Sequence, residues 1–230
     1  MAKICVVIPA FDEEQSIVKV IADIPKSVHT IIVANNNSKD NTEEVAQKAG
    51  AVVINESQMG YGFACLAGIN YILKNEPDTD IVVFLDGDYS DFPNELPLLV
   101  NPILEHQYDF VLGARTKKLR EKGAMTPQQV FGNWLACFLM RIIYGSKFTD
   151  LGPFRAIKFS VLQGLKMQDT TYGWTVEMQL KVLKQKLKYK EVDVNYRNRI
   201  GVSKISGTIK GTILAGIKII GWIVKYSFKK

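Results

Sequence analysis

The chain has 230 residues, of which 47% are hydrophobic, and it carries 29 Lys and Arg against 23 Asp and Glu. This length and apolar content suit one large α/β domain, and the net charge of +6 favours anionic partners without identifying one. Three separated cysteines in apolar segments and two histidines, with no Cys pair at ligand spacing, argue against a zinc site and indicate buried thiols in a reducing compartment. The chain enters a strand pattern at once, so we expect no signal peptide and a cytoplasmic location.

The first half of the chain alternates strand-like and helix-like patterns. The strands are expected at residues 3–8, 30–34, 51–54 and 81–85, and the helices at residues 14–24, 40–50 and 62–74. Pro9 is expected to end the first strand, and the segment from Asp40 to Glu43 resembles a capping box that begins the second helix. Such alternation implies right-handed crossovers and a mainly parallel sheet with its loops gathered at one edge.

The second half is less regular. We expect strands at residues 109–112 and 187–196, helices at residues 128–143 and 174–185, and a turn-rich loop at residues 150–155. Neither a low-complexity linker nor an internal repeat interrupts the sequence, so residues 1–206 are expected to form one domain.

Polar residues follow the strands at the expected loop edge of the sheet. The clearest are Asp86 and Asp88, which leave the fully apolar run 81–85 at positions i and i+2. Ligands bind at this edge in open α/β sheets, and paired carboxylates suit Mg²⁺ or Mn²⁺ held together with substrate phosphates. The alternative is a plain turn, since Asp-Gly is a common turn pair.

The order of these loops resembles the inverting glycosyltransferases of family 2, which have the GT-A fold, and within them the dolichyl-phosphate mannose and glucose synthase group. The matching segments are Pro9-Ala-Phe-Asp-Glu13, Asn35-Asn-Asn-Ser-Lys-Asp40-Asn-Thr42, Asp86-Gly-Asp88, Val111-Leu-Gly-Ala-Arg115 and Asp150-Leu-Gly-Pro-Phe-Arg155. The resemblance implies a nucleotide-sugar half at residues 1–95 and an acceptor half at residues 96–206.

The resemblance also implies roles for individual residues. Nucleotide-sugar binding falls to Pro9, Ala10, Phe11, Glu13, Asn36, Asp86, Gly87 and Asp88, with Asp86 and Asp88 as the metal ligands. Phosphate or acceptor binding falls to Arg115, Arg155, Arg199 and Lys204, and catalysis to Asp88, Arg115 and Glu177. For the arginines and Lys204 the alternative is a solvated surface, and for Glu177 it is an exposed helix carboxylate in place of an acceptor-side base.

Two positions depart from the family pattern. Asn35 and Asn36 stand where the family has a carboxylate pair, and an amide donates as well as accepts, so the choice between uracil and guanine stays open. Ser90 stands where some members offer a longer metal ligand, which predicts weaker metal binding.

Residues 207–230 form a basic amphipathic pattern with no acidic residue. On a helical wheel the lysines gather within an arc of about 100°, opposite a row of aliphatic residues. The lysines are Lys210, Lys218, Lys225 and Lys229, the aliphatic residues are Ile209, Ile213, Ile217, Ile220 and Val224, and Trp222 and Tyr226 lie at the border. Such a helix is typical of attachment to an anionic membrane, and the alternative is packing on its own domain or a dimer contact.

Together these features predict a hexosyltransferase that uses Mg²⁺ or Mn²⁺ to move a sugar from a UDP- or GDP-sugar to a polyprenyl phosphate, peripheral on the cytoplasmic face of a membrane. The alternatives are a soluble transferase of the same fold with a saccharide or protein acceptor, and a non-catalytic module that binds nucleotide sugars. We expect no nucleic-acid partner, because no RNA or DNA motif surrounds the basic residues. A homo-oligomer is left open.

Overall fold

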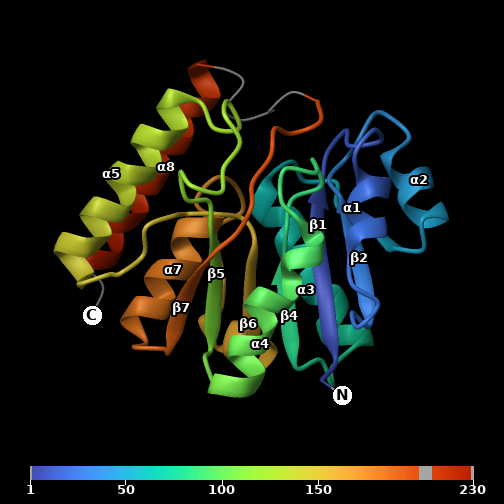
Figure 1. Cartoon of the computed structure of the whole chain (residues 1–230), viewed down its shortest axis with the longest axis horizontal. Helices are drawn as coiled ribbons and strands as arrows, with labels where there is room; N and C mark the ends of the chain where they lie inside the picture. The colour runs from blue at the N-terminus through green and yellow to red at the C-terminus, as the bar shows by residue number, and fades with distance from the viewer. Residues whose placement is uncertain (1, 202–208, 229–230) are drawn as a thin grey trace.

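The computed structural model describes residues 2–201 and 209–228, which form one seven-stranded sheet with helices on both faces (Figure 1). The strands are β1 (Ile4–Ala10), β2 (Thr30–Asn35), β3 (Val52–Asn55), β4 (Ile81–Phe84), β5 (Phe110–Ala114), β6 (Arg155–Lys158) and β7 (Tyr189–Asp193). The helices are α1 (Ile17–Asp23), α2 (Thr42–Lys48), α3 (Tyr61–Asn75), α4 (Leu96–His106), α5 (Pro127–Tyr144), α6 (Phe159–Leu165), α7 (Trp174–Lys184) and α8 (Ile209–Phe228), with a 3₁₀ turn η1 (Pro93–Glu95).

The strand order is β3-β2-β1-β4-β6-β5-β7. Within the described sheet only β6 runs antiparallel, to both β4 and β5, which confirms the predicted α/β class and mainly parallel sheet. The carboxyl ends of β1, β2 and β4 therefore meet at one edge, which Figure 1 shows at the top of the molecule.

The apolar strands separate two cores. In β1, Cys5 and Val7 face a core shared with α3, α5, α7 and α8, whereas Val6 and Ile8 face a core shared with α1, α2 and α4. Successive side chains of a strand point to opposite faces, so a strand buried on both sides must be apolar throughout. This explains the unbroken apolar runs in β1 and β4.

Two predicted boundaries were wrong for identifiable reasons. β1 continues through Pro9 to Ala10, because β4 pairs with β1 only as far as Val7 and the missing N–H of Pro9 breaks no bond with β4. The capping box at α2 does not form. The carboxylate of Asp40 instead accepts the backbone N–H of Thr42 at 3.0 Å and that of Glu14 at 3.1 Å, which joins the loops after β1 and β2.

The second half contains elements that the sequence did not reveal. Neither α4 nor α6 was predicted, and the loop expected at residues 150–155 ends in strand β6, which begins at Arg155. β6 inserts between β4 and β5 and separates the first four strands of the chain from β5 and β7.

Helix α8 packs on the domain, which was one of the alternatives for the C-terminal segment. It lies beside α5 and also contacts α7 (Figure 1). The hydroxyl of Tyr144 donates to the carbonyl of Ile223 at 2.6 Å, and the indole N–H of Trp222 donates to the buried carboxylate of Asp169 at 2.5 Å. Gly173 makes room for this contact, since a Cβ there would lie 2.4 Å from the Trp222 ring.

None of the helices in the described residues combines the length and the apolarity that crossing a bilayer requires.

Candidate functional site

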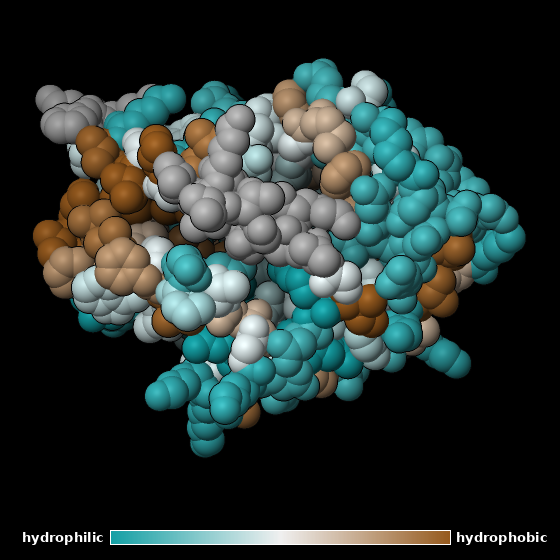
Figure 2. All heavy atoms as spheres, turned by 90° about the horizontal axis from the view of Figure 1, so that it is seen from above, coloured by the Kyte–Doolittle hydropathy of each residue, from teal (hydrophilic) through white to brown (hydrophobic). Residues whose placement is uncertain are grey.

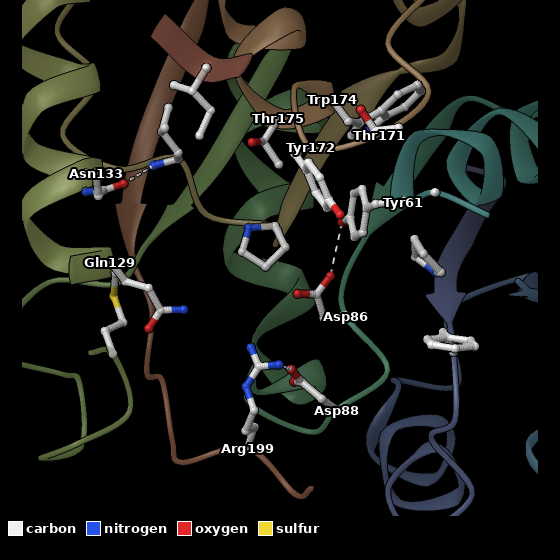
Figure 3. Close-up of a pocket in the computed structure, with 18 of the residues that line it drawn as sticks. Tyr61, Asp86, Asp88, Gln129, Asn133, Thr171, Tyr172, Trp174, Thr175 and Arg199 are labelled. Carbon is white, nitrogen blue, oxygen red and sulfur yellow. Dashed lines mark hydrogen bonds and ion pairs between the residues drawn. The ribbon is translucent and has the colours of Figure 1, made fainter. Parts of the chain in front are cut away.

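A cavity of about 790 Å³ opens at the carboxyl edge of the sheet. The ends of β1 and β4 form one side through Pro9, Asp86 and Asp88, while α5 and α8 form the other through Gln129 and Ile220. Figure 3 shows Asp86 and Asp88 opposite Gln129 and Asn133, with Tyr172 and Thr175 above Asp86 in this view. The cavity therefore joins a polar floor at the sheet to a largely apolar wall.

Asp86 and Asp88 are both aimed and held by neighbours (Figure 3). The hydroxyl of Tyr61 donates to Oδ1 of Asp86 at 3.1 Å. Ser90 donates its backbone N–H to Oδ1 of Asp88 at 2.9 Å and its hydroxyl at 2.5 Å, while Nη1 of Arg199 lies 2.9 Å from Oδ2. Ser90 is thus positioned to orient the Asp88 carboxylate.

The side chains of Asp86, Asp88 and Asp91 form an acidic group that is largely shielded from solvent. Burial, and then the charge of Asp88, raise the pKa of Asp86 to about 6. Burial and the charges of Asp86 and Asp88 also raise the pKa of Asp91 well above its ordinary value. Oδ1 of Asp91 is buried without a hydrogen-bond partner among the described residues. A cation would relieve this crowding of acidic groups.

The donor set fits a small hard cation. Asp86 and Asp88 line the cavity and supply carboxylate oxygens, which are the ligands that Mg²⁺ and Mn²⁺ prefer. Groups of three or more His, Cys, Asp or Glu with metal-site geometry are absent from the described residues. This is consistent with a cation held by two carboxylates and completed by the phosphates of a ligand.

The shifted pKa of Asp86 leads to a prediction on stability. When the pKa of a carboxyl is higher in the folded state than in the unfolded state, the folded protein becomes less stable as pH rises through these two pKa values. We expect Asp86→Asn, which has no charge to desolvate, to be more stable than the wild type at pH 8 by on the order of 2–3 kcal/mol. The advantage should shrink below pH 6. Metal-free thermal denaturation from pH 4.5 to 8 tests this, and a variant destabilised at pH 8 would contradict it.

Arg199 and Arg115 both line the cavity. The segment that carries Arg199 runs along the loop that carries Asp86 and Asp88, because Ile200 donates its N–H to the carbonyl of Asp88 at 2.9 Å. Arg115 forms a bidentate pair with Asp150, with both N–O distances at 2.8 Å, and this pair uses two of its five N–H groups. Asp150 therefore fixes the guanidinium at the cavity wall.

Arg155 does not line the cavity. Its side chain is fully buried, and it donates to the backbone carbonyls of Leu151, Gly152 and Thr175. Burial lowers the pKa of this guanidinium to about 10. The structure thus places Arg155 where it supports the 150–155 loop from behind, and not where it would meet a phosphate.

Glu177 is neither an exposed helix carboxylate nor a member of the cavity lining. It is fully buried at the start of α7, where it accepts the backbone N–H groups of Gln168 and Asp169 and pairs with Lys181 at 2.7 Å. These bonds tie α7 to the loop before it. The structure therefore separates Glu177 from the position expected of an acceptor-side base.

Asn36 lines the cavity, but its amide is engaged at both ends. Its Nδ2 donates to the carbonyls of Glu56 and Gln58 at 3.1 and 2.7 Å, and its Oδ1 accepts the N–H of Gly60 at 2.8 Å. A carboxylate has no N–H groups to donate to two carbonyls, which explains an amide at this position. Asn36 therefore joins the end of β2 to the loop before α3.

The remaining predicted site residues either line the cavity or lie outside the described part of the chain. Those that the structure brings together around the cavity are Pro9, Ala10, Phe11, Glu13 and Gly87. Lys204 lies outside the described residues.

Other lining residues escaped the sequence analysis. Tyr61 directly precedes the helix expected at residues 62–74, and neither it nor Gln129, Tyr172 or Thr175 was assigned a role from the sequence. Their approach to the cavity depends on how α5 and α7 pack, which sequence spacing does not encode.

Comparisons with known proteins identify the family of the chain and proteins that share its fold. A family model described as Glycosyl transferase family 2 matches residues 5–165. An uncharacterized glycosyltransferase of Mycobacterium tuberculosis is 32% identical over 92% of this chain and 94% of its own length, and the dolichyl-phosphate hexose transferase of Haloferax volcanii is 30% identical over 88% of this chain and 86% of its own. The structure of glucosyl-3-phosphoglycerate synthase from M. tuberculosis, in complex with Mn²⁺, UDP and phosphoglyceric acid, matches with a TM-score of 0.79 at 20% identity, over 100% of this chain and 80% of that one.

Proposed function

The chain belongs to glycosyl transferase family 2 and is a glycosyltransferase, and on this premise we propose that it transfers a hexose, with inversion, from a UDP- or GDP-sugar to a polyprenyl phosphate, using Mg²⁺ or Mn²⁺. The nucleotide sugar would lie against the loops after β1 and β4, with its diphosphate at Asp86 and Asp88. A glycosyltransferase crystallised with Mn²⁺ and UDP shares this fold, which supports the choice of donor and metal.

The observation that carries the acceptor assignment is the distribution of carboxylates around the cavity. Among the described lining residues Glu13, Asp86 and Asp88 come from the β1 and β4 loops, and the α5, α7 and α8 side contributes no Asp, Glu or His. A hydroxyl acceptor requires a base, whereas a phosphate is already ionised and attacks without one. The buried position of Glu177 thus favours a phosphate nucleophile.

The apolar wall favours a lipid on that phosphate. Phe131, Leu135, Ile219 and Ile220 line the cavity on the α5 and α8 side. A polyprenyl chain would lie along these side chains while its phosphate meets Arg199 and Arg115. A relative named a dolichyl-phosphate hexose transferase supports the same acceptor class.

In the reaction, an acceptor phosphate oxygen forms a bond to the anomeric carbon as the bond from that carbon to the nucleoside diphosphate breaks. Asp86 and Asp88 would hold a divalent cation, which would neutralise the negative charge of the departing diphosphate. Arg199 would hold the acceptor phosphate in line with the anomeric carbon, and Asp150 keeps Arg115 directed at the cavity wall. Tyr61 and Ser90 hold the two carboxylates in place.

A small phosphorylated acceptor is the second candidate. It is favoured by the structural likeness to an enzyme named for glucosyl-3-phosphoglycerate synthesis. In that case the apolar wall of α5 and α8 would not contact the substrate.

The test is a transfer assay with radiolabelled UDP- and GDP-hexoses against a short-chain polyprenyl phosphate and against 3-phosphoglycerate. We expect labelled lipid from one donor, and loss of the product with EDTA that added Mn²⁺ or Mg²⁺ restores. Label transferred only to phosphoglycerate would favour the second candidate. Product from neither acceptor, with each donor intact, would contradict both.

A further inference from the structure

Helix α5 exposes an apolar stripe that no part of the described chain covers. Phe131, Trp134, Phe138 and Ile142 recur at spacings of three and four residues, which places them on one side of the helix. Their exposed fractions are 61%, 56%, 41% and 65%. The rings of Trp134 and Phe138 stack with centroids 5.4 Å apart, and Phe131 lies 5.9 Å from Trp134. Large side chains so exposed and so ordered mark an interaction surface.

Helix α8 extends this surface. Ile217, Ile220 and Val224 are 65%, 39% and 44% exposed, whereas Trp222 and Tyr226 on the other side of the helix are buried. We name these three residues, with Phe131, Trp134, Phe138 and Ile142, the α5–α8 face. Figure 2 shows hydrophobic residues gathered at the end of the molecule where these helices lie.

This orientation is the reverse of the one expected from water solubility alone. Lys218 turns toward the domain, where its Nζ lies 3.2 Å from the carboxylate of Asp169, while Ile217 faces outward. The predicted border residues Trp222 and Tyr226 are likewise buried, so Ile217, Ile220 and Val224 of the aliphatic row are presented to the exterior together with α5.

The α5–α8 face adjoins the cavity. Phe131 and Ile220 are exposed and also line the cavity, so one apolar surface runs from the exterior to the proposed acceptor side of the site. An occupant of this face would lie beside the opening through which an acceptor enters.

The basic charge of the sequence around the α5–α8 face indicates which kind of partner would bind there. Residues 122–149 and 194–230, which include α5 and α8, contain eleven of the chain's 29 basic residues and none of its 23 acidic ones. Lys225 and Arg141 are exposed on α8 and α5 themselves. A second copy on this face would bring two such basic segments together, whereas an anionic lipid surface would neutralise them.

We propose that the α5–α8 face docks the enzyme on an anionic lipid bilayer, with Trp134 and Phe138 of α5 as the inserted anchors. The prediction from sequence assigned membrane contact to residues 207–230 alone. The structure instead pairs α8 with α5 and gives α5 the larger exposed side chains. If the proposed function holds, docking at this face would let a lipid acceptor reach the cavity without leaving the bilayer.

The experiment measures binding of the full chain to vesicles by flotation, with phosphatidylcholine alone or with about 30% phosphatidylglycerol. We expect binding to the anionic vesicles that weakens with salt. The double variant Trp134→Ser, Phe138→Ser should lower the partition coefficient at least about tenfold. The matched control is Leu98→Ser, Leu104→Ser on α4, whose two leucines are 48% and 49% exposed and should leave binding unchanged.

Tryptophan fluorescence gives a second readout. The chain has three tryptophans, of which Trp174 and Trp222 are buried and Trp134 is exposed. Lipids brominated in the acyl chains should quench the wild type, and Trp134→Phe should lose most of this quenching while it still binds vesicles.

The proposal is overturned if the wild type does not bind anionic vesicles or if the double variant binds them as the wild type does. It is also overturned if the wild type is a dimer and the double substitution converts it to a monomer. Transfer to a short-chain acceptor in detergent separates this outcome from the fate of the proposed function. A wild-type protein that transfers sugar in detergent but does not bind anionic vesicles overturns docking at this face alone. Transfer absent with vesicle binding intact overturns the acceptor assignment alone.

Discussion

Asp88→Asn is expected to lower kcat/KM for sugar transfer by about 10³-fold, which corresponds to about 4 kcal/mol of lost transition-state stabilisation. The carboxylate is oriented by Ser90 and lines the cavity beside Asp86, where it would hold the cation that neutralises the leaving diphosphate. An amide keeps the shape and one acceptor oxygen but carries no charge, so cation affinity should fall as well. Steady-state kinetics and Mn²⁺ titration followed by electron paramagnetic resonance measure both effects.

The control for this variant is Asp109→Asn. Asp109 also pairs with a cation, with 2.9 Å between its Oδ1 and Nζ of Lys158, but it lies at the start of β5, at the opposite edge of the sheet from the cavity. The same chemical change there should leave kcat/KM and Mn²⁺ binding at wild-type values. If Asp88→Asn retained most of its turnover with the fold intact, the metal role of the carboxylate pair would be wrong.

The site residues that sequence reasoning located best are those at the ends of predicted parallel strands. Asp86 and Asp88 follow a strand whose apolar run shows burial on both faces, and topology then fixes the edge at which the carboxylates emerge. The same argument placed Pro9 and Glu13 near them. Local pattern and a general rule of sheet topology were sufficient for these positions.

Arg155 and Glu177 show where that reasoning stops. Both carry a charge in a segment similar to a family motif, and charge in a motif favours a role in binding or catalysis. The structure buries both: Arg155 behind the 150–155 loop and Glu177 under the 168–169 turn. Which side of a motif faces the ligand is decided by packing of β6 and α7, and neither the insertion of β6 nor the approach of α7 is encoded in residue spacing.

Helix α8 makes the same point about amphipathic patterns. The sequence predicted an apolar row and a basic row, but the pattern alone does not say which row faces the domain. That choice depends on Asp169, a buried acceptor about fifty residues earlier that receives Lys218 and the indole N–H of Trp222. A long-range polar contact thus set the orientation of the helix.

Trp222→Ala is expected to detach α8 and to destabilise its docking by about 3–5 kcal/mol, the usual range for removal of a buried tryptophan. The Trp222 ring is 8% exposed, packs on Tyr226 with centroids 5.1 Å apart, and donates to Asp169. Its loss leaves a cavity and removes one of the two groups of α8 that reach the buried Asp169 carboxylate, and both effects favour release of the helix. Amide hydrogen exchange should show loss of protection across residues 214–228, and thermal denaturation should show a lower Tm.

Trp134→Ala provides the matched comparison, because the same atoms are removed from a side chain that is 56% exposed on the neighbouring helix. Its effect on stability should stay within about 0.5–1 kcal/mol, as for other exposed positions. The two variants should therefore affect different measurements. Trp222→Ala should change hydrogen exchange and Tm, whereas Trp134→Ala should change vesicle binding alone. Equal protection of α8 in both variants would show that the contact with Asp169 does not hold the helix, and that the outward orientation of Ile217 and Val224 has another cause.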